Sequence, residues 1–382
     1  MHDLKQPETA AALAEMLRAA SAAKQPVELG GRFTKRQWGG PVSEGSLRIS
    51  TSSLARVLEY EPRDLTISVE AGMPYAELTA LLARNNQMIP LDPPYTAEAT
   101  VGGVVASNQS GPRRRLFGTA RDLVIGMQFA TMDGRLIQSG GMVVKNVAGL
   151  DMGKLMIGSW GTLAAITTLN FKLIPKDKST RTFVQCFDSA KDALAERNRI
   201  LQSVLQPAAL DILNPDAAKN VGQSGWTLAM GTGGSQALVD RYSRELPSAR
   251  CLDGAAETAF WARISGFAAD FVAANARGAI LRVSTVLQGM AEVLETHSGP
   301  AIARAANGVA YLYFPDGPTR QATADGNWPE ANRSAVWECA PSDMAAQLRW
   351  PAPGNALAVM NRIKTMLDPK HLLNKGRLYG RI

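Results

Sequence analysis

The sequence is poor in the residues that build metal centres and disulfide scaffolds. Only three cysteines and three histidines occur among 382 residues, and no two cysteines form a CxxC pair. These counts exclude a disulfide-stapled fold, a cysteine zinc site and an iron–sulfur cluster held by this chain alone. A histidine-rich metal centre is not expected either, and we predict no metal site.

Long apolar runs are also missing. One long uncharged stretch, residues 155–171, contains two glycines and several polar residues, whereas a membrane-spanning helix needs about 20 mostly apolar residues. The N-terminus shows no apolar segment followed by a cleavage site. We therefore expect no signal peptide and a cytoplasmic location, with any membrane association made through partners.

Positive charge exceeds negative charge only mildly. The formal net charge is +7, and the sequence pI is about 9.4. The basic residues are scattered, aromatic residues make up 6% of the chain, and the one dense basic run is residues 113–115. This pattern does not indicate nucleic-acid binding, but it favours small anionic ligands.

The common nucleotide and hydrolase motifs are absent as well. No G-x-G-x-x-G opens a helix after a strand, and no Walker loop, nucleophile elbow or HExxH motif is present. A bound nucleotide must therefore be held by another architecture.

The hydrophobic patterns that are present predict an α+β protein in three parts. Residues 1–175 combine glycine-rich loops with expected helices (8–23, begun by Thr9, and 74–85), expected strands (27–29, 47–50, 65–70, 163–174) and a hairpin (123–139) turned at Asp133–Gly134. Residues 176–345 repeat a strand–helix–strand pattern (182–187, 189–204, 208–213, then 279–285, 287–296, 308–314), which predicts one antiparallel sheet with helices on one face. Residues 346–382 form a C-terminal return with a helix at 355–367.

Three segments rich in small residues are candidate binding sites: residues 30–40, 100–111 and 158–163. Glycine lets the backbone approach a bulky anion, and successive N–H groups can bind phosphate oxygens. The alternatives are an ordinary surface turn for the first segment and close helix packing for the second. The nearby Asp122 and Asp151 are expected to pair with Arg121 and Lys154, and His297 and His371 to be partly exposed structural residues.

Taken in order, these motifs resemble the FAD-binding domain of the vanillyl-alcohol oxidase/p-cresol methylhydroxylase superfamily. Within it they are most similar to the smaller FAD-binding subunits of bacterial glycolate oxidases. The resemblance implies an α+β fold: a two-subdomain FAD-binding domain (1–175), an α+β, ferredoxin-like cap domain (176–345) and a return to the first domain (346–382). The matching segments are 30–35, 100–103, 111–113, 118–122, 144–149, 158–163 and, near the C-terminus, 367–377.

The same resemblance implies that FAD lies between the two subdomains. Residues 30–35 would cover its pyrophosphate, and residues 100–103 and 108–111 would line the pyrophosphate and ribityl chain. The remaining predicted residues, Gly118, Asp122, Gly161, Thr162 and Ile166, would contact adenine, ribose or flavin edges. The predicted cofactor-binding residues are Gly30, Gly31, Arg32, Phe33, Thr34, Lys35, Thr100, Val101, Gly102, Gly103, Ser107, Asn108, Gly111, Gly118, Asp122, Gly161, Thr162 and Ile166.

Three features depart from the catalytic relatives' pattern. Leu150 stands where a tyrosine is usual, Trp160 stands where a glutamate is usual, and the cap lacks the histidine cluster that holds a 2-hydroxy acid. The first loop has no histidine or cysteine placed for covalent attachment, so we expect non-covalent FAD. Lys145 or Arg115 could stabilise the reduced flavin, or could simply pair with carboxylates or phosphate. We assign no catalytic residue.

The implied function is that of an FAD-bearing subunit oxidising glycolate to glyoxylate, with a larger FAD subunit and an iron–sulfur subunit as partners. The missing histidines motivate an alternative, a non-catalytic scaffold subunit of the same complex. A stand-alone FAD-linked oxidoreductase acting on D-lactate is a further alternative.

Overall fold

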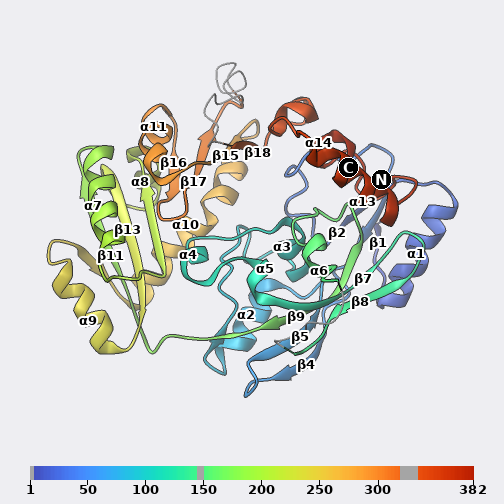
Figure 1. The fold of residues 1–382 in the computed structure, drawn as a ribbon, viewed down its shortest axis with the longest axis horizontal. Helices are drawn as coiled ribbons and strands as arrows, with labels where there is room; N and C mark the ends of the chain where they lie inside the picture. The colour runs from blue at the N-terminus through green and yellow to red at the C-terminus, as the bar shows by residue number, and fades with distance from the viewer. Residues whose placement is uncertain (1–3, 144–149, 319–333) are drawn as a thin grey trace. The chain divides into compact units, whose positions relative to one another are not determined.

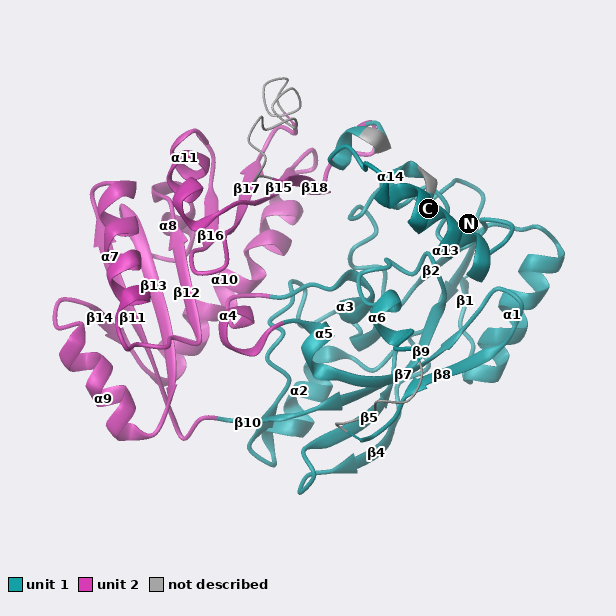
Figure 2. Cartoon of the chain, viewed as in Figure 1, with its two compact units in different colours: residues 1–110, 119–176, 345–382 teal, residues 111–118, 177–344 magenta. Residues whose placement is uncertain are grey.

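The computed structural model describes residues 4–143, 150–318 and 334–382, and Figure 1 shows the order of their helices and strands. Internal contacts divide the chain into two compact units (Figure 2). Unit 1 comprises Met1–Ser110, Thr119–Lys176 and Ala345–Ile382, and unit 2 comprises Gly111–Gly118 and Asp177–Met344. Residues 111–118, which we placed in the first domain, therefore pack with unit 2.

One part of unit 1 is a small parallel sheet covered by a helix. The strand order is β1 (Leu4–Lys5), β3 (Leu47–Ser50), β2 (Val27–Gly30). Helix α1 (Ala10–Ala22) begins as predicted at Thr9, whose hydroxyl oxygen accepts a hydrogen bond from the amide of Ala12 at 3.1 Å. Its buried face, including Leu13 and Leu17, shares one apolar core with β2 and β3.

The other part of unit 1 is a five-stranded antiparallel sheet with its own core. The order is β4 (Val57–Glu61), β5 (Thr66–Glu70), β9 (Ala165–Lys172), β7 (Val124–Ala130), β8 (Leu136–Gly140), and β7–β8 is the predicted hairpin. Two cores in one unit agree with the predicted two-subdomain arrangement. The remaining elements of unit 1 are α2 (Tyr75–Ala83), α3 (Val101–Ser107), α5 (Ala120–Leu123), α6 (Gly153–Met156), η2 (Ala346–Arg349), α13 (Ala356–Leu367), α14 (Leu378–Arg381) and the pair β6 (Gln87–Met88) and β10 (Ile174–Pro175).

Unit 2 is built on one eight-stranded sheet in which every pairing is antiparallel, as predicted. The order is β14 (Arg250–Leu252), β11 (Ser179–Phe187), β13 (Trp226–Gly234), β12 (Ala209–Leu213), β16 (Ala301–Arg304), β17 (Val309–Phe314), β15 (Ala279–Ser284), β18 (Ser334–Cys339). Its helices are α4 (Arg114–Phe117), α7 (Ala190–Gln202), α8 (Pro215–Asn220), α9 (Gln236–Glu245), α10 (Gly254–Ala274), η1 (Leu287–Gly289) and α11 (Met290–Glu295).

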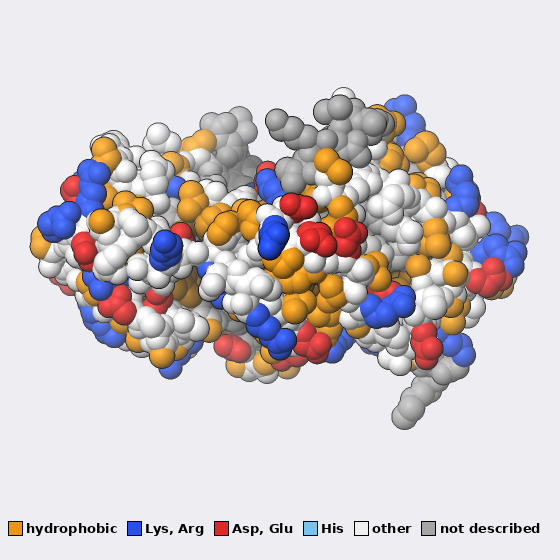
Figure 3. Space-filling view, turned by 90° about the horizontal axis from the view of Figure 1, so that it is seen from below, with side chains coloured by type: hydrophobic (Ala, Val, Ile, Leu, Met, Phe, Trp, Pro, Cys, Tyr) orange, Lys and Arg blue, Asp and Glu red, His pale blue; other side chains and the backbone are white. Residues whose placement is uncertain are grey.

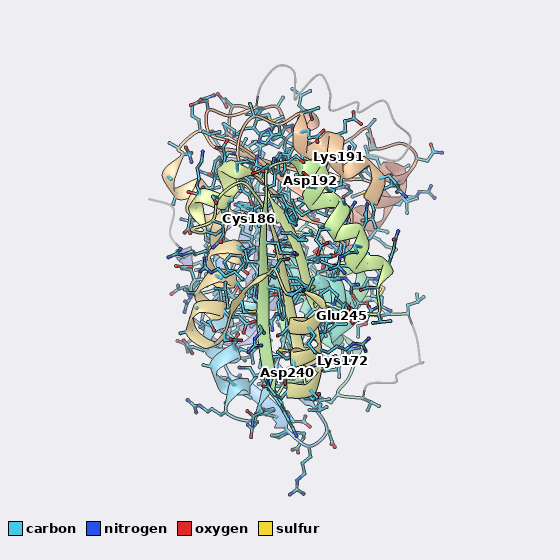
Figure 4. All side chains as sticks on the ribbon, turned by 90° about the vertical axis from the view of Figure 1, so that its left-hand side faces the viewer. Lys172, Cys186, Lys191, Asp192, Asp240 and Glu245 are labelled. Atoms are coloured by element: carbon cyan, nitrogen blue, oxygen red, sulfur yellow. The ribbon has the colours of Figure 1, made fainter. Side chains whose placement is uncertain are left out.

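Helices cover both faces of this sheet, so the prediction of helices on one face is wrong. Helices α7, α9 and α11 share a core with the strand residues on one face, and Figure 4 looks onto α7, with Lys191 and Asp192 in its first turn, and α9. Helix α10 packs on the other face, where the indole N–H of Trp261 donates to the hydroxyl of Thr182 at 2.6 Å. The name ferredoxin-like stays a prediction.

The face of the molecule drawn in Figure 3 shows no field of a single sign among the described residues. In the space-filling view of Figure 3, basic and acidic side chains are interspersed among apolar and neutral ones. None of the helices in the described ranges, the 21-residue α10 included, is both long and apolar enough to cross a bilayer.

Candidate functional site

Unit 1 contains a cavity that is partly open to solvent. Its walls come from the loop after β2, from α3, from the turn before β9 and from residues 368–377 after α13, called the C-terminal segment below. Many of the predicted cofactor-binding residues lie on this lining: Gly30, Gly31, Arg32, Phe33, Thr34, Lys35, Thr100, Gly102, Gly103, Ser107, Gly161 and Ile166.

The loop after β2 forms a wall that only small residues allow. A Cβ atom on Gly31 would lie 2.1 Å from the hydroxyl oxygen of Thr100, and one on Gly30 would lie 2.7 Å from the ring of Phe33. Phe33 itself has a φ of 56°, in the left-handed region, and its ring lies 4.7 Å from the guanidinium of Arg48. The loop backbone is therefore held close to the start of α3.

Helix α3 lines the cavity with small residues only: Gly102, Gly103, Ala106 and Ser107. Thr100 caps it, because its hydroxyl oxygen accepts a hydrogen bond from the amide of Gly103 at 3.3 Å. A Cβ on Gly102 would lie 2.7 Å from the Cβ of Ala71, so the helix lies directly against that residue. Backbone amides at a helix start favour negative charge, and this end of α3 lies at the lining.

The turn before β9 is strained in a way that suits glycine at two of its positions. Gly158 and Gly161 have φ values of 80° and 67°, and Trp160 between them has 56°. The Asn374 side chain holds this turn: its Nδ2 donates to the carbonyl oxygen of Trp160 at 2.9 Å, and its Oδ1 accepts from the amide of Leu29 at 2.8 Å. One amide side chain thus connects β2, the turn and the C-terminal segment.

A buried ion pair fixes the same C-terminal segment. Lys364 Nζ lies 2.7 Å from Asp368 Oδ2, and both side chains are 1% exposed. The ammonium group also donates to the carbonyl oxygens of Thr162 at 2.6 Å and Leu373 at 2.9 Å. Burial lowers the pKa of Lys364, while Asp368 acts in the opposite direction. The group therefore positions backbone and does not face the cavity.

Positive charge gathers at the cavity. Glu28 is buried and forms ion pairs with two arginines. Arg36 Nε lies 2.6 Å from Glu28 Oε1, and Arg48 Nε lies 3.3 Å from Glu28 Oε2. Lys35 and Arg377 also line the cavity, and Lys35 Nζ lies 5.9 Å from the centre of a tyrosine ring. The pKa of Arg377 is lowered to about 10. Burial is the main cause, and the charge of Glu28 acts in the opposite direction.

These features fit FAD, which is flat at both ends and carries two negative charges on its diphosphate. A Cβ at Gly31 would collide with Thr100 and one at Gly102 with Ala71, so glycine at both positions lets the loop and α3 pack closely where they line the cavity. The Nε of the buried Arg377 has no hydrogen-bond partner among the described residues. The glycine-rich loop, the start of α3 and the two cations are the groups that would hold the cofactor.

Six predicted residues do not line this cavity, each for a local reason. Val101 is buried in the apolar core, Asn108 ends α3 in the left-handed conformation, and Thr162 is buried with its hydroxyl donating to Ser159. Asp122 caps α5 by accepting from the amide of Thr119 at 2.8 Å, and was expected to pair with Arg121. Gly111 and Gly118 belong to unit 2.

Other predictions of the sequence analysis fall elsewhere. Lys145 lies in residues 144–149, outside the described ranges. Arg115 donates to the carbonyl oxygen of Pro207 within unit 2 at 3.3 Å. Leu150 is 87% exposed, and Asp151 pairs with Lys154 at 3.1 Å, as expected. Within the described ranges no three histidine, cysteine, aspartate or glutamate side chains are grouped to hold a metal ion.

The sequence analysis did not select some residues that line the cavity. Several are small or apolar and carry no sequence signal. Arg377 did have a signal, because it lies in the C-terminal segment that resembles the family's closing motif. Arg36, Ala106 and Trp160 lie within the three candidate segments, although they were not among the predicted cofactor-binding residues. The added lining residues are Leu29, Arg36, Thr51, Ala71, Ala99, Ala106, Trp160 and Arg377.

Comparison with known proteins gives matches to flavoproteins. Residues 4–140 match the family described as FAD binding domain. The chain is 34% identical over 205 residues to glycolate oxidase subunit GlcE of Escherichia coli (strain K12), covering 53% of this chain and 57% of that protein. It is 28% identical over 202 residues to glycolate oxidase subunit GlcD of Bacillus subtilis (strain 168), covering 53% and 43%. The matched region thus spans about half the length of these relatives.

A solved structure extends the similarity to nearly the whole chain. The 4-ethylphenol oxidase from Gulosibacter chungangensis, solved with isoeugenol, superposes with a TM-score of 0.73 at 17% identity, covering 98% of this chain and 88% of that one. At this identity the similarity concerns the fold.

Proposed function

We propose that this chain is an FAD-bearing subunit of a 2-hydroxy-acid oxidoreductase. The premises are that it contains an FAD-binding domain, that it is homologous to glycolate oxidase subunits, and that it has the predicted vanillyl-alcohol oxidase/p-cresol methylhydroxylase-type fold. The proposed reaction is the oxidation of glycolate to glyoxylate. The observation that carries the proposal is the glycine-lined, cationic cavity of unit 1.

The protein's part in this function is to hold and orient the cofactor. When bound, FAD supplies the acceptor for the two electrons that leave the hydroxyl-bearing carbon of the substrate. Gly31 and Gly102 allow the close packing of the loop and α3 that shapes the cavity wall, and Lys35 and Arg377 place positive charge on its lining. Asn374 and Lys364 fix the C-terminal segment that completes the wall. We propose that FAD is held here without a covalent bond.

The proposed partners are a larger FAD subunit and an iron–sulfur subunit. The names of the two relatives, which are each called a subunit, support an assembly of more than one chain. In this assembly electrons would leave this chain's flavin singly towards the iron–sulfur partner. We propose a cytoplasmic location, with any membrane contact made by the partners.

Anaerobic reduction of the assembled complex tests the proposal. The full chain is co-expressed with both partners, glycolate is added without oxygen, and the visible flavin absorbance is followed, with D-lactate as a second acid. We expect glycolate to bleach the flavin, and one glyoxylate to form for every two electrons that the flavins and the iron–sulfur cluster take up. No bleaching in a complex that contains FAD would overturn the substrate assignment, and faster bleaching by D-lactate would change the acid.

A non-catalytic role within the same complex is the second candidate. The observation that favours it is that both histidines in the described ranges make structural contacts away from the cavity: His297 with the carbonyl oxygen of Tyr313 at 3.1 Å, and His371 with Thr365 at 2.9 Å. A complex carrying Gly31→Ala in this chain separates the two roles. Loss of glycolate oxidation favours the catalytic role, and full activity with this chain free of flavin favours the scaffold.

A further inference from the structure

The proposed function does not say which part of the cofactor Arg377 would contact. It follows Gly376 at the end of the C-terminal segment, far in sequence from the glycine-rich loop, yet it lines the same cavity. Arg377 is 5% exposed. A buried guanidinium is costly unless it is paired and hydrogen-bonded, so its partners decide its role.

The protein itself satisfies Arg377 only in part. One terminal nitrogen, Nη1, donates to the carbonyl oxygen of Trp38, and the guanidinium carbon lies 5.8 Å from the centre of the Trp160 ring. Its Nε has no hydrogen-bond partner within the described residues. Neither contact supplies a negative charge.

The neighbouring carboxylate is already in use. Glu28 binds Arg36 through both oxygens, at 2.6 and 2.9 Å, and its Oε2 also lies 3.3 Å from Arg48. Two arginines therefore already contact this carboxylate, and Arg377 feels its charge only at longer range. Burial is the largest cause of the lowered pKa of Arg377, and the charge of Glu28 opposes it only in part.

We infer that Arg377 binds the diphosphate of FAD and supplies a charge-assisted hydrogen bond to one of its oxygens. The inference rests on the FAD-binding role of the cavity and adds one residue to it. The diphosphate carries the only formal charges of oxidised FAD at neutral pH, so it is the part of the cofactor that a buried cation favours. Arginine suits phosphate because its planar donors match the oxygens.

Two fragments of the cofactor separate this role from a contact with the flavin ring. ADP contains the diphosphate without the flavin, and riboflavin contains the flavin without phosphate. The full-length chain is freed of flavin and titrated with FAD, ADP and riboflavin by calorimetry. The variants are Arg377→Met, Arg377→Lys, which keeps the charge, and the control Lys375→Met, an exposed lysine of the same segment.

We expect Arg377→Met to weaken FAD and ADP binding by about 10- to 100-fold, the factor that corresponds to one charge-assisted hydrogen bond, and to leave riboflavin binding unchanged. Arg377→Lys should recover part of the loss, and Lys375→Met should bind like the wild type. The melting temperature of the flavin-free variants shows whether the contact with Trp38 is needed for folding. If Arg377→Met does not fold, the lysine variant and its ADP affinity decide.

Three outcomes would overturn the inference. Unchanged FAD and ADP affinity in a folded Arg377 variant would exclude a bond to the diphosphate. An equal loss for riboflavin would indicate a role in the shape of the cavity or at the flavin ring. A loss as large in Lys375→Met would indicate general disturbance of the segment. Failure of the wild-type chain to bind FAD at all would instead contradict the proposed function.

Discussion

At the scale of single residues, the cavity depends on the contact between Gly31 and Thr100. These residues come from different segments, and an added methyl group on Gly31 would stand 2.1 Å from the threonine hydroxyl. Thr100 cannot move away freely, because it also caps α3. The contact therefore links the shape of the loop to the position of the helix.

Gly31→Ala tests this contact. The extra Cβ should push the loop away from α3, and overpacking of this kind costs about 1–3 kcal/mol, so we expect FAD affinity to fall by about tenfold or more. The matched control is Gly141→Ala in the same unit, where no atom lies within 4 Å of the added Cβ. Fluorescence titration with FAD measures both, and equal affinities for the two variants would contradict the role of Gly31.

His297 makes a second prediction at this scale. It lies against the ring of Phe314 at 4.6 Å, and burial lowers its pKa. The unfolded chain therefore binds a proton more readily than the folded one near the ordinary value of about 6.5. Its contribution to stability is complete above that pH and decreases as the pH falls below it.

Replacing His297 by glutamine keeps a hydrogen-bond donor for Tyr313 but removes the titration. We expect the melting temperature of the wild type to fall more steeply than that of His297→Gln between about pH 7 and about pH 5.5. Thermal unfolding followed by circular dichroism across this range provides the comparison. Parallel curves would show that His297 does not contribute to the pH dependence.

Residue types predicted the cavity better than residue roles did. Gly31 and Gly102 were selected because small residues cluster there, and both line the cavity. Val101 and Asn108 come from the same clusters, but one turns into the core and the other ends a helix. Which way a side chain points depends on helix phase and on packing partners that a single sequence does not reveal.

At the scale of elements, the C-terminal helix α13 and the residues after it complete unit 1. The buried pair Lys364–Asp368 joins α13 to the turn before β9 through Thr162 and to the following segment through Leu373. Asp368 also accepts from the amides of Leu372 and Leu373, both at 2.8 Å. Removing one member leaves the other charge buried without its partner.

Lys364→Met tests the pair. Breaking a buried ion pair in this way costs about 3–5 kcal/mol of unfolding free energy, and we expect a clear decrease in the urea midpoint of unit 1. Arg362→Met, an exposed position of the same helix, should change it by less than about 0.5 kcal/mol. A Lys364→Met protein as stable as this control would show that the pair does not hold the segment.

Elements with a regular pattern were predicted and irregular ones were not. The period-two strand at 65–70 and the hairpin at Asp133–Gly134 are confirmed. Strand β13 was missed because Gly231, Gly233 and Gly234 interrupt its pattern. Helix α10 was missed because small residues, including Gly266, blur its apolar stripe. Its packing on the second face of the sheet depends on tertiary contacts that no local pattern encodes.

At the scale of the whole molecule, the cavity is assembled from distant parts of unit 1. The loop after β2, helix α3, the turn before β9 and the C-terminal segment each contribute to its lining. Unit 2 has its own sheet and its own apolar core. The sequence predicted that a second α+β region follows Pro175, because the texture of the chain changes there.

Hydrogen exchange tests this assembly. Adding FAD to the flavin-free full-length chain should slow amide exchange together in residues 27–36, 99–107, 160–166 and 374–377, because ordering one wall orders the others. Strands of the unit 2 core, such as β12 and β16, should change least. Mass spectrometry of peptides measures all of them in one experiment, and protection limited to a single segment would contradict a shared site.

The bond between Asn374 and Leu29 also determines when the cofactor can enter. The two residues are 345 positions apart, and the ribosome makes the chain from the N-terminus. Strand β2 and the loop after it are made first, and the part of the cavity lining that Arg377 contributes is missing until translation has passed that residue. At the proposed FAD site, the cavity therefore closes only after residue 377 has been made, and a translation product that ends before it lacks this part of the wall.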